Sequence, residues 1–346
     1  MMQKPVSRRG KVLRFFDRRA VMIVAACIGL LALLWVPTTQ PFVASTPTVT
    51  QVVDPAALER HVRALSETFH PRSFDRKDKL DAAADYIAGE FARIGFAVEF
   101  QPFQVDGEIF RNVVVRIPDR AGSLAGERFV VGAHYDSHGD GEGEDSHTPG
   151  ADDNASGVAG LIELARLLKL RPLGRPVDLV AFCLEEPPNF DTPDMGSAHH
   201  ATALREAGAR VRLMLSIEMI GYFNDAEGSQ AYPFAPLKLF YPNRGDFIAV
   251  VGRYRDWQDT RILKGAMRGT GNIAVESINA PLFVPGIDLS DHLNYWKAGF
   301  PALMITDTAF YRNDQYHRRG DTADRLDFVR MAKVVSALDA GIRAFD

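Results

Sequence analysis

The sequence predicts an α/β fold in which helices cover both faces of a central, mostly parallel β-sheet. Segments with the pattern of strands alternate along the chain with segments of helical period. Several strand segments are continuously apolar, as expected of strands that helices cover on both faces. With 346 residues, 46% of them hydrophobic, the chain can bury one large core. We therefore expect a three-layer α/β sandwich.

The first 36 residues differ from the rest. Residues 1–19 carry seven Lys or Arg side chains against one acid, and residues 20–36, AVMIVAACIGLLALLWV, carry no charge. The length of this run is at the lower limit for a membrane-spanning helix and slightly greater than that of the usual apolar core of a signal peptide. The basic flank places the N-terminus in the cytoplasm and the remaining chain outside. We expect an exported protein. It is either anchored at the periplasmic face of the inner membrane or released by cleavage near Val43-Ala44-Ser45, and both alternatives stay open.

Charge and cysteine content exclude other classes. The whole chain has a net charge of −4. Setting aside the 7 basic and 1 acidic side chains of residues 1–45 leaves 33 basic against 43 acidic, a balance of −10. Such an acidic domain is a poor candidate for nucleic-acid binding, which needs positive charge. Cys27 and Cys183 lie in separate apolar segments, so we expect no disulfide to hold the fold.

The elements of the domain follow in order. Residues 37–54, rich in Thr, Pro and Val, are expected to link the N-terminal segment to a domain of residues 55–346. Apolar residues of helical period run from Pro55 to Phe69, and a second helix is predicted over Lys77–Ile94. The strands predicted are Ala97–Phe103, Phe110–Ile117, Arg128–His134, Val177–Leu184, Val211–Glu218, Phe247–Gly252 and Ala302–Thr306. The remaining helices predicted are Gly157–Lys169, Ala198–Glu206, Trp257–Arg268 and Leu326–Phe345.

Three of these strands lead into acidic side chains. The segment FVVGAHYD ends in His134 and Asp136, VDLVAFCLEE ends in Glu185 and Glu186, and VRLMLSIEM ends in Glu218. In open α/β sheets the site lies beyond the carboxyl ends of the strands. We therefore expect these side chains to converge there, joined by the two acids of the intervening loop, Asp152 and Asp153.

So many carboxylates in one place repel one another unless a positive charge is close. None of these strand ends contains Lys or Arg, which leaves a divalent cation as the expected partner. Mixed imidazole and carboxylate ligands suit Zn²⁺, with Co²⁺ or Mn²⁺ as alternatives. The candidates outnumber the ligands of one tetrahedral zinc, so we expect two ions about 3.5–4 Å apart, bridged by a carboxylate.

The motifs resemble those of a known family. GAHYDS, PGADDNASGVAGLIELARLL, the Glu-Glu pair, IEMIGY, SDH and YHRRGDTADRLDF are similar to the motifs of co-catalytic zinc aminopeptidases of the secreted bacterial leucyl-aminopeptidase type, to which glutamate carboxypeptidase is related. The similarity covers roughly Val53–Phe345, with the motifs in the same order. It implies a zinc-exopeptidase fold with a central mixed sheet of about eight strands, and a peptide substrate with a free N-terminus.

The resemblance also implies the metal ligands. His134 and Glu218 would hold one zinc, Glu186 and His317 would hold the other, and Asp153 would bridge both. In the familiar members an Asp stands where this chain has Glu218. We expect this difference to alter the geometry of that metal position while leaving the ligand type unchanged.

Two further acids receive catalytic roles from the resemblance. Glu185 would be the general base that takes a proton from a metal-activated water and passes it to the leaving amine. Asp136 would orient the His134 ring, because a ligating imidazole normally donates its other N–H to an acceptor.

Four other residues have less specific interpretations. His292, in LSDHLNYW, either contacts the substrate or packs a loop, and Tyr222 is a candidate substrate-binding residue. His138 and His147 lie in the loop between ligands and are expected to be solvated, with a third metal site as the alternative.

Two rival functions share the fold. A glutaminyl cyclase is an acyltransferase with one zinc, and that group lacks the histidine found here at His134. A receptor-like relative keeps the fold, loses the ligands and acts as a binding module. Because all five ligands and the base are present, the sequence favours a zinc exopeptidase, and within that class an aminopeptidase.

Overall fold

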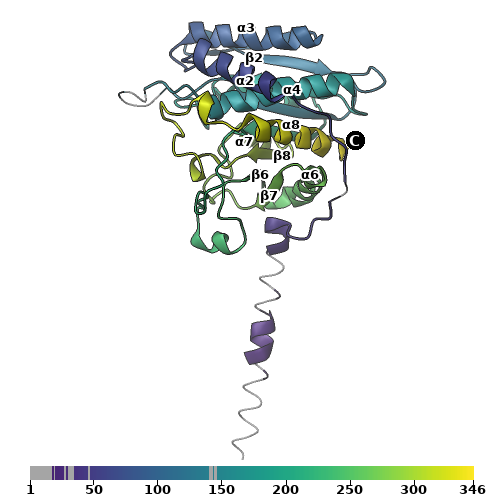
Figure 1. The fold of residues 1–346 in the computed structure, drawn as a ribbon. Helices are drawn as coiled ribbons and strands as arrows, with labels where there is room; N and C mark the ends of the chain where they lie inside the picture. The colour runs from purple at the N-terminus through teal and green to yellow at the C-terminus, as the bar shows by residue number, and fades with distance from the viewer. Residues whose placement is uncertain are drawn as a thin grey trace, which may run out of the picture.

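The protein is built on one mixed sheet of eight strands (Figure 1). The computed structural model describes residues 18, 20–26, 29, 35–45, 47–139, 143 and 146–346. The strands are β1 (Val98–Val105), β2 (Glu108–Ile117), β3 (Arg128–His134), β4 (Val177–Phe182), β5 (Val211–Glu218), β6 (Phe247–Gly252), β7 (Ala274–Asn279) and β8 (Ala302–Thr306). They lie in the order β1-β2-β4-β3-β5-β8-β6-β7. The predicted α/β fold with a mixed sheet is confirmed.

Helices cover both faces of this sheet. They are α2 (Pro55–Arg63), α3 (Lys77–Ile94), α4 (Gly157–Leu170), α5 (Gly196–Glu206), α6 (Trp257–Gly269), α7 (His292–Lys297) and α8 (Phe328–Arg343). Five of them, α2, α3, α4, α6 and α8, share one apolar cluster with Val131 of β3. The other two, α5 and α7, share a second cluster with the neighbouring Val130. Successive side chains of a strand point to opposite faces, so a continuously apolar strand fills both clusters.

The strand directions place the site. β3 runs parallel to β4 and β5, and β5 runs parallel to β8. β2 and β6 run antiparallel to their neighbours in this central group. The carboxyl ends of β3, β4 and β5 therefore meet at one edge of the sheet, where the sequence predicts the acids to gather.

Most predicted elements are present, and four strands have the predicted bounds: Arg128–His134, Val211–Glu218, Phe247–Gly252 and Ala302–Thr306. Two elements, β7 and the six-residue α7, were not predicted from the sequence. β7 has the sequence AVESIN, in which only alternate residues are buried, because it is the last strand of the sheet. Because of its polar side chains, β7 lacks the continuously apolar pattern by which the other strands were predicted.

The N-terminal segment is described in part. Residues 1–17, 19, 27, 28 and 30–34 lie outside the described residues, and with them much of the expected anchor or signal core. In the described parts of the chain, no helix combines the length and apolar character needed to span a membrane. Part of the expected linker packs on the domain: Thr39 and Gln40 are buried, and Gln40 Nε2 donates to Asn279 Oδ1 of β7. The Lys264 ammonium of α6 donates to the Thr39 carbonyl.

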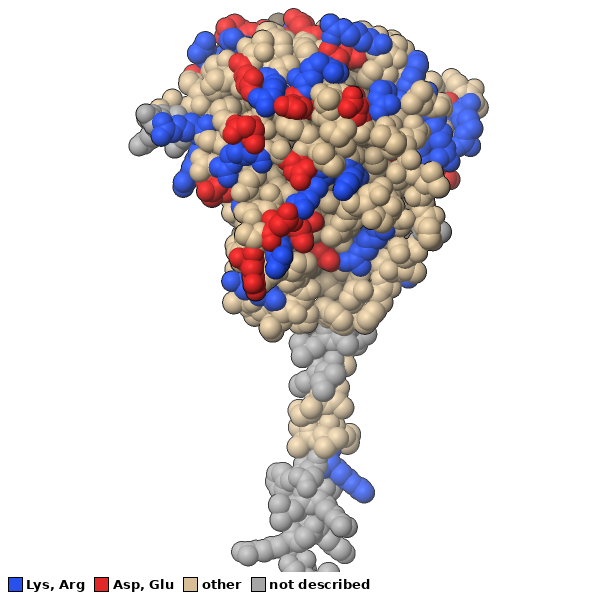
Figure 2. Space-filling view, in the orientation of Figure 1, with Lys and Arg blue, Asp and Glu red and all other residues tan. Residues whose placement is uncertain are grey.

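Charged side chains of both signs lie side by side on the face of the domain seen in Figure 2. Figure 2 shows basic and acidic side chains interspersed over the visible face of the domain. Many form local ion pairs, such as Arg116 with Glu99 on the antiparallel pair β1 and β2, at 2.6 Å. The visible charges therefore compensate one another locally and do not form a patch of one sign.

A buried histidine makes stability dependent on pH. His200 of α5 is 3% exposed, and its Nδ1 lies 2.6 Å from the Tyr295 hydroxyl. Burial lowers the pKa of His200 to about 3. In the unfolded chain an ordinary histidine takes up a proton below about pH 6.5. Between pH 6.5 and 3 only the unfolded state is protonated at this residue, so stability falls as pH falls.

We expect this contribution to disappear in His200→Gln. Between pH 7.5 and 5.5, the free energy of unfolding of the wild type should fall by about 1.4 kcal/mol more than that of the variant. Urea titrations of both proteins at the two pH values measure this difference. The change in the free energy of unfolding between the two pH values is measured for each protein separately. The loss of the Tyr295 hydrogen bond in the variant affects both pH values equally and therefore cancels. Equal pH dependence in the two proteins would show that His200 does not titrate as described.

Candidate active site

The predicted site residues come from five separate segments and meet at the carboxyl edge of the parallel strands. His134 ends β3 and Glu218 ends β5. Glu185 and Glu186 follow the end of β4. Asp153 lies in the helical turn Ala151–Ser156 that precedes α4, and His317 lies in the loop after β8.

One group of side chains surrounds the His134 ring. Its Nε2 lies 3.3 Å from Asp153 Oδ1, 3.4 Å from Glu218 Oε2 and 3.8 Å from Glu185 Oε2. On the other side of the ring, Nδ1 lies 3.4 Å from Asp136 Oδ1. The structure thus brings together five of the residues that the sequence predicts.

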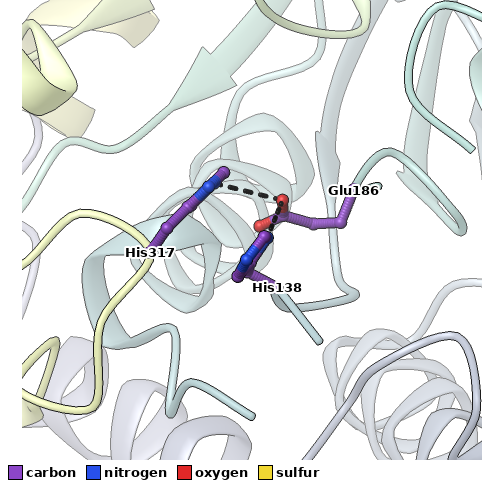
Figure 3. A group of neighbouring side chains, drawn as sticks. All are labelled: His138, Glu186 and His317. Atoms are coloured by element: carbon purple, nitrogen blue, oxygen red, sulfur yellow. Dashed lines mark ion pairs between the residues drawn. The ribbon is translucent and has the colours of Figure 1, made fainter. Parts of the chain in front are cut away.

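A second group lies beside the first and shares Asp153 with it. His317 Nε2 lies 3.2 Å from Asp153 Oδ2 and 3.2 Å from Glu186 Oε2. His138 Nδ1 points at the same Glu186 oxygen, at 3.6 Å (Figure 3). The expectation that His138 is solvated is wrong: only 12% of its side chain is exposed, because its ring stacks on that of His317.

Outer groups hold these side chains in place. Asp136 Oδ2 accepts from the Glu186 backbone N–H at 2.9 Å, so one carboxylate fixes both a ring and a neighbouring ligand segment. Ser290 Oγ donates to Glu218 Oε2 at 2.7 Å. The Asp321 carboxylate accepts from the Asp153 N–H at 3.0 Å. Ser290 and Asp321 fall within the motifs SDH and RRGDT, but nothing in the sequence indicates these contacts.

A buried arginine adds a positive charge near the site. The strand ends contain no cation, but Arg72, from a loop 62 residues before His134, is fully buried behind the site. Its guanidinium donates to the carbonyl oxygens of Tyr135 and Gly150, which lie in the loops that carry the ligands. Burial lowers the pKa of Arg72 to about 10, and the nearby charge of Asp136 raises it, so the side chain stays charged at neutral pH. Its hydrogen bonds go to backbone carbonyls, so it does not pair with the carboxylates directly.

The electrostatics of the site reflect crowded acids. Burial, opposed by His134 and reinforced by Glu218 and Glu186, raises the pKa of the Glu185 carboxyl well above its usual range. Burial would also raise the pKa of Asp153, but the nearby imidazoles of His134 and His317 hold it below its usual value. Ionised carboxylates at these separations require positive charge close by.

The side chains fit a metal. Both ring nitrogens of His134, Nδ1 of His138 and Oε1 of Glu186 are buried without a hydrogen-bond partner in the described part of the chain. Two atoms bound to one tetrahedral zinc at about 2.0–2.1 Å lie about 3.3 Å apart. The separations of 3.2–3.4 Å around Asp153 agree with this spacing. Each group contains one set of side chains able to hold metal: His134 with Asp153 and Glu218 in the first, and His138 with Glu186 and His317 in the second. A further set, His134 with Glu185 and Glu186, spans the two groups.

The two proposed substrate residues lie apart from these groups. His292 is buried, its Nε2 lies 2.7 Å from the Ile287 carbonyl oxygen, and its ring packs edge-on against Trp296. These contacts pack the loop around His292. Tyr222 accepts a hydrogen bond from Arg325 through its hydroxyl. Neither side chain lines the groove described next.

An apolar groove opens beside the metal-binding groups. It begins at Glu218 and Tyr316 and runs across β8 and β6 to β7. Its floor includes Met304 and Phe247, and Tyr241 forms part of its wall. Three strand spacings separate β5 from β7, so the groove extends about 14 Å from the site. The sequence did not reveal it, because its walls come from loops of irregular pattern.

Several known proteins are similar to this chain in sequence or in fold. The uncharacterized protein YfbL of Escherichia coli (strain K12) is 48% identical over 300 residues, 86% of this chain and 91% of the other. The probable aminopeptidase YDR415C of Saccharomyces cerevisiae is 27% identical over 237 residues, 64% of this chain and 54% of the yeast protein. The solved structure of Fimbriiglobus ruber glutaminyl cyclase has a TM-score of 0.66 at 20% identity, over 86% of this chain and 98% of that chain, which shows a shared fold.

The sequence model of one family covers most of the domain. It is described as Peptidase family M28 and matches residues 112–339. The matched range includes every residue placed in the two metal-binding groups. The family is zinc-dependent, and the resemblance drawn from the motifs is confirmed. The chain belongs to Peptidase family M28.

Proposed function

We propose that this peptidase is an aminopeptidase that works with two zinc ions. The observation that carries the proposal is the position of Asp153, whose Oδ1 lies 3.3 Å from His134 Nε2 and whose Oδ2 lies 3.2 Å from His317 Nε2. A carboxylate between two sets of donors suits a bridged pair of ions. His134 and Glu218 belong to one position, Glu186 and His317 to the other. Bound zinc lowers the pKa of water and polarises a carbonyl.

Two acids of the chain complete the chemistry. We assign Glu185 as the general base, since its carboxylate lies beside the His134 ring at the centre of the cluster. It takes the proton of the attacking water and delivers it to the leaving amine. Asp136 holds the His134 ring on one side and the Glu186 backbone on the other, so it positions two ligands together.

Action at a free N-terminus is supported by three features. The yeast relative is named a probable aminopeptidase. The cluster has more carboxylates than positive side chains, which suits a substrate that brings a charged amine. The groove beside Glu218 is apolar and accommodates the side chain of the first residue. We therefore propose a preference for large apolar residues at that position.

A cyclase function is the main rival, since the fold is shared with a glutaminyl cyclase. A likeness at 20% identity concerns the fold and does not separate the two reactions. His134 separates the two reactions, because the resemblance implies that the cyclases have no histidine at this position. Its buried, unpartnered ring nitrogens favour a second metal position and hydrolysis.

We also propose that the N-terminal segment stays attached and anchors the domain outside the cytoplasm. The uncharged run of residues 20–36 and its basic flank support a membrane segment. The burial of Thr39 and Gln40 favours retention, because cleavage near Val43-Ala44-Ser45 would remove both from their contacts with β7 and α6.

The assigned base gives the first test. Glu185→Gln keeps the shape of the side chain and removes its basicity, so it should retain zinc and lose about 10²–10⁴ in turnover. Metal content by atomic emission and kcat on a leucyl substrate measure the two effects. Glu99→Gln on the exposed face of β1 is the control and should behave as wild type. Turnover near wild type in Glu185→Gln would exclude it as the base.

A substrate panel tests the proposed specificity. Leucyl and phenylalanyl p-nitroanilides should be cleaved with kcat/KM at least about tenfold above the lysyl and aspartyl compounds, because the groove favours apolar surface. N-acetylation of the leucyl substrate should block cleavage. A chelator should abolish activity and added zinc should restore it. Efficient cleavage of the acetylated substrate would contradict aminopeptidase action.

Fractionation of cells tests the anchor. The full chain with a C-terminal tag should remain in the membrane fraction after alkaline extraction, with its N-terminal residues intact. N-terminal sequencing of the purified protein identifies any cleavage. A mature chain that begins near residue 46 would show that the segment is removed.

A further inference from the structure

His138 lies where a metal ligand would lie, although its sequence position did not indicate one. It is four residues beyond the end of β3, and its ring stacks on the ring of His317 with centroids 4.0 Å apart and planes 11° from parallel. Figure 3 shows the two imidazoles approaching the same carboxylate, that of Glu186. The three ligand atoms lie within 4.8 Å of one another.

The backbone around His138 is fixed by contacts on both sides. The His138 carbonyl accepts from the Thr148 N–H at 3.0 Å, and the Ser137 N–H donates to the Arg72 carbonyl at 3.1 Å. Gly139 packs so closely on Ser73 that an added Cβ would lie 2.2 Å from the Ser73 Cβ. The backbone that carries the His138 ring is therefore held by contacts other than the stacking on His317.

The ring nitrogen that faces the site has no hydrogen-bond partner among the described residues. His138 Nδ1 is buried, and Glu186 Oε2 at 3.6 Å is beyond hydrogen-bond distance. Leaving a buried polar atom unpaired costs about 1–3 kcal/mol. His147, nine residues further on, differs: its Nδ1 lies 3.0 Å from Ser73 Oγ. Of these two loop histidines, only His138 has a free nitrogen directed at the cluster.

We propose that His138 is an additional ligand at the metal position of Glu186 and His317, an inference that rests on the proposed zinc function. This position then offers two imidazoles with the carboxylates of Glu186 and Asp153. The position of His134 and Glu218 offers one imidazole and carboxylates. Imidazole suits zinc, whereas carboxylate sites also accept magnesium, calcium and manganese. The two positions therefore differ, and the one with His138 fills first and holds zinc more tightly.

Two variants separate ligation from stacking. His138→Phe keeps an aromatic ring on His317 and removes the nitrogen, whereas His138→Ala removes both. Loss of even an outer partner of a ligand costs 10- to 100-fold in metal affinity. We therefore expect both variants to bind the tighter zinc at least about tenfold more weakly. His147→Phe is the matched control from the same loop and should bind zinc as wild type.

The measurement is zinc titration of the metal-free full chain, by calorimetry or against a chelating dye, after circular dichroism confirms that each variant is folded. Wild-type affinity in His138→Phe, whether or not His138→Ala is weakened, would overturn the inference and leave the ring a stacking role. A wild type that binds no zinc would instead refute the proposed function, and with it this inference.

X-ray absorption on the zinc-loaded wild type gives a second test that needs no variant. Scattering from imidazole should correspond to three rings, those of His134, His138 and His317, shared by two ions. Two rings for two ions would exclude His138 while leaving the two-zinc site intact. The failure of this inference and the failure of the proposed function are thus distinguishable.

Discussion

The structure depends on the burial of several like charges at one edge of a sheet. Asp153, Glu185, Glu186 and Glu218 are each at least 93% buried. Two like charges 4 Å apart repel by about 4 kcal/mol at an effective dielectric constant of 20. The fold places imidazoles between these acids and supplies backbone N–H groups and hydroxyls to the acids around them. Arg72 adds a buried cation that binds the carbonyls of the ligand loops. A site of this kind is stable only when positive charge is built into it or bound by it.

Much of this arrangement could be predicted from the sequence. The period of the apolar residues and the polar residues that end each run fix the strands, so β3, β5, β6 and β8 have their predicted bounds. Because the carboxyl ends of parallel strands meet at one edge of the sheet, the same pattern predicts that His134, Glu186 and Glu218 lie close together. Asp153 comes from the loop that the same reasoning places at this edge, although its bridging role was implied only by the resemblance to a family. His317 comes from a loop that only the resemblance assigned to the site.

The remainder depends on contacts between distant segments. His138 was expected to be solvated because it lies in the loop between ligands. Its burial arises from the stacking of its ring on His317, while Arg72 and Ser73, from a segment more than 60 positions earlier, hold the backbone of the same loop. The groove was missed for the same reason. Its walls combine the segments around Tyr241 and Phe310 with three strands, and no local period records that combination.

The last strand of the sheet, β7, carries charge that opposes the addition of a further strand. An exposed strand edge can template pairing with another chain, and charged side chains in such a strand oppose this. Glu276 lies in the middle of β7, and Arg268 and Lys264 of α6 reach around to it at 3.0 and 3.2 Å. To extend the sheet here, a ninth strand would have to accommodate this ionic clamp. The charged side chains at β7 therefore oppose the pairing of another chain with this edge of the sheet.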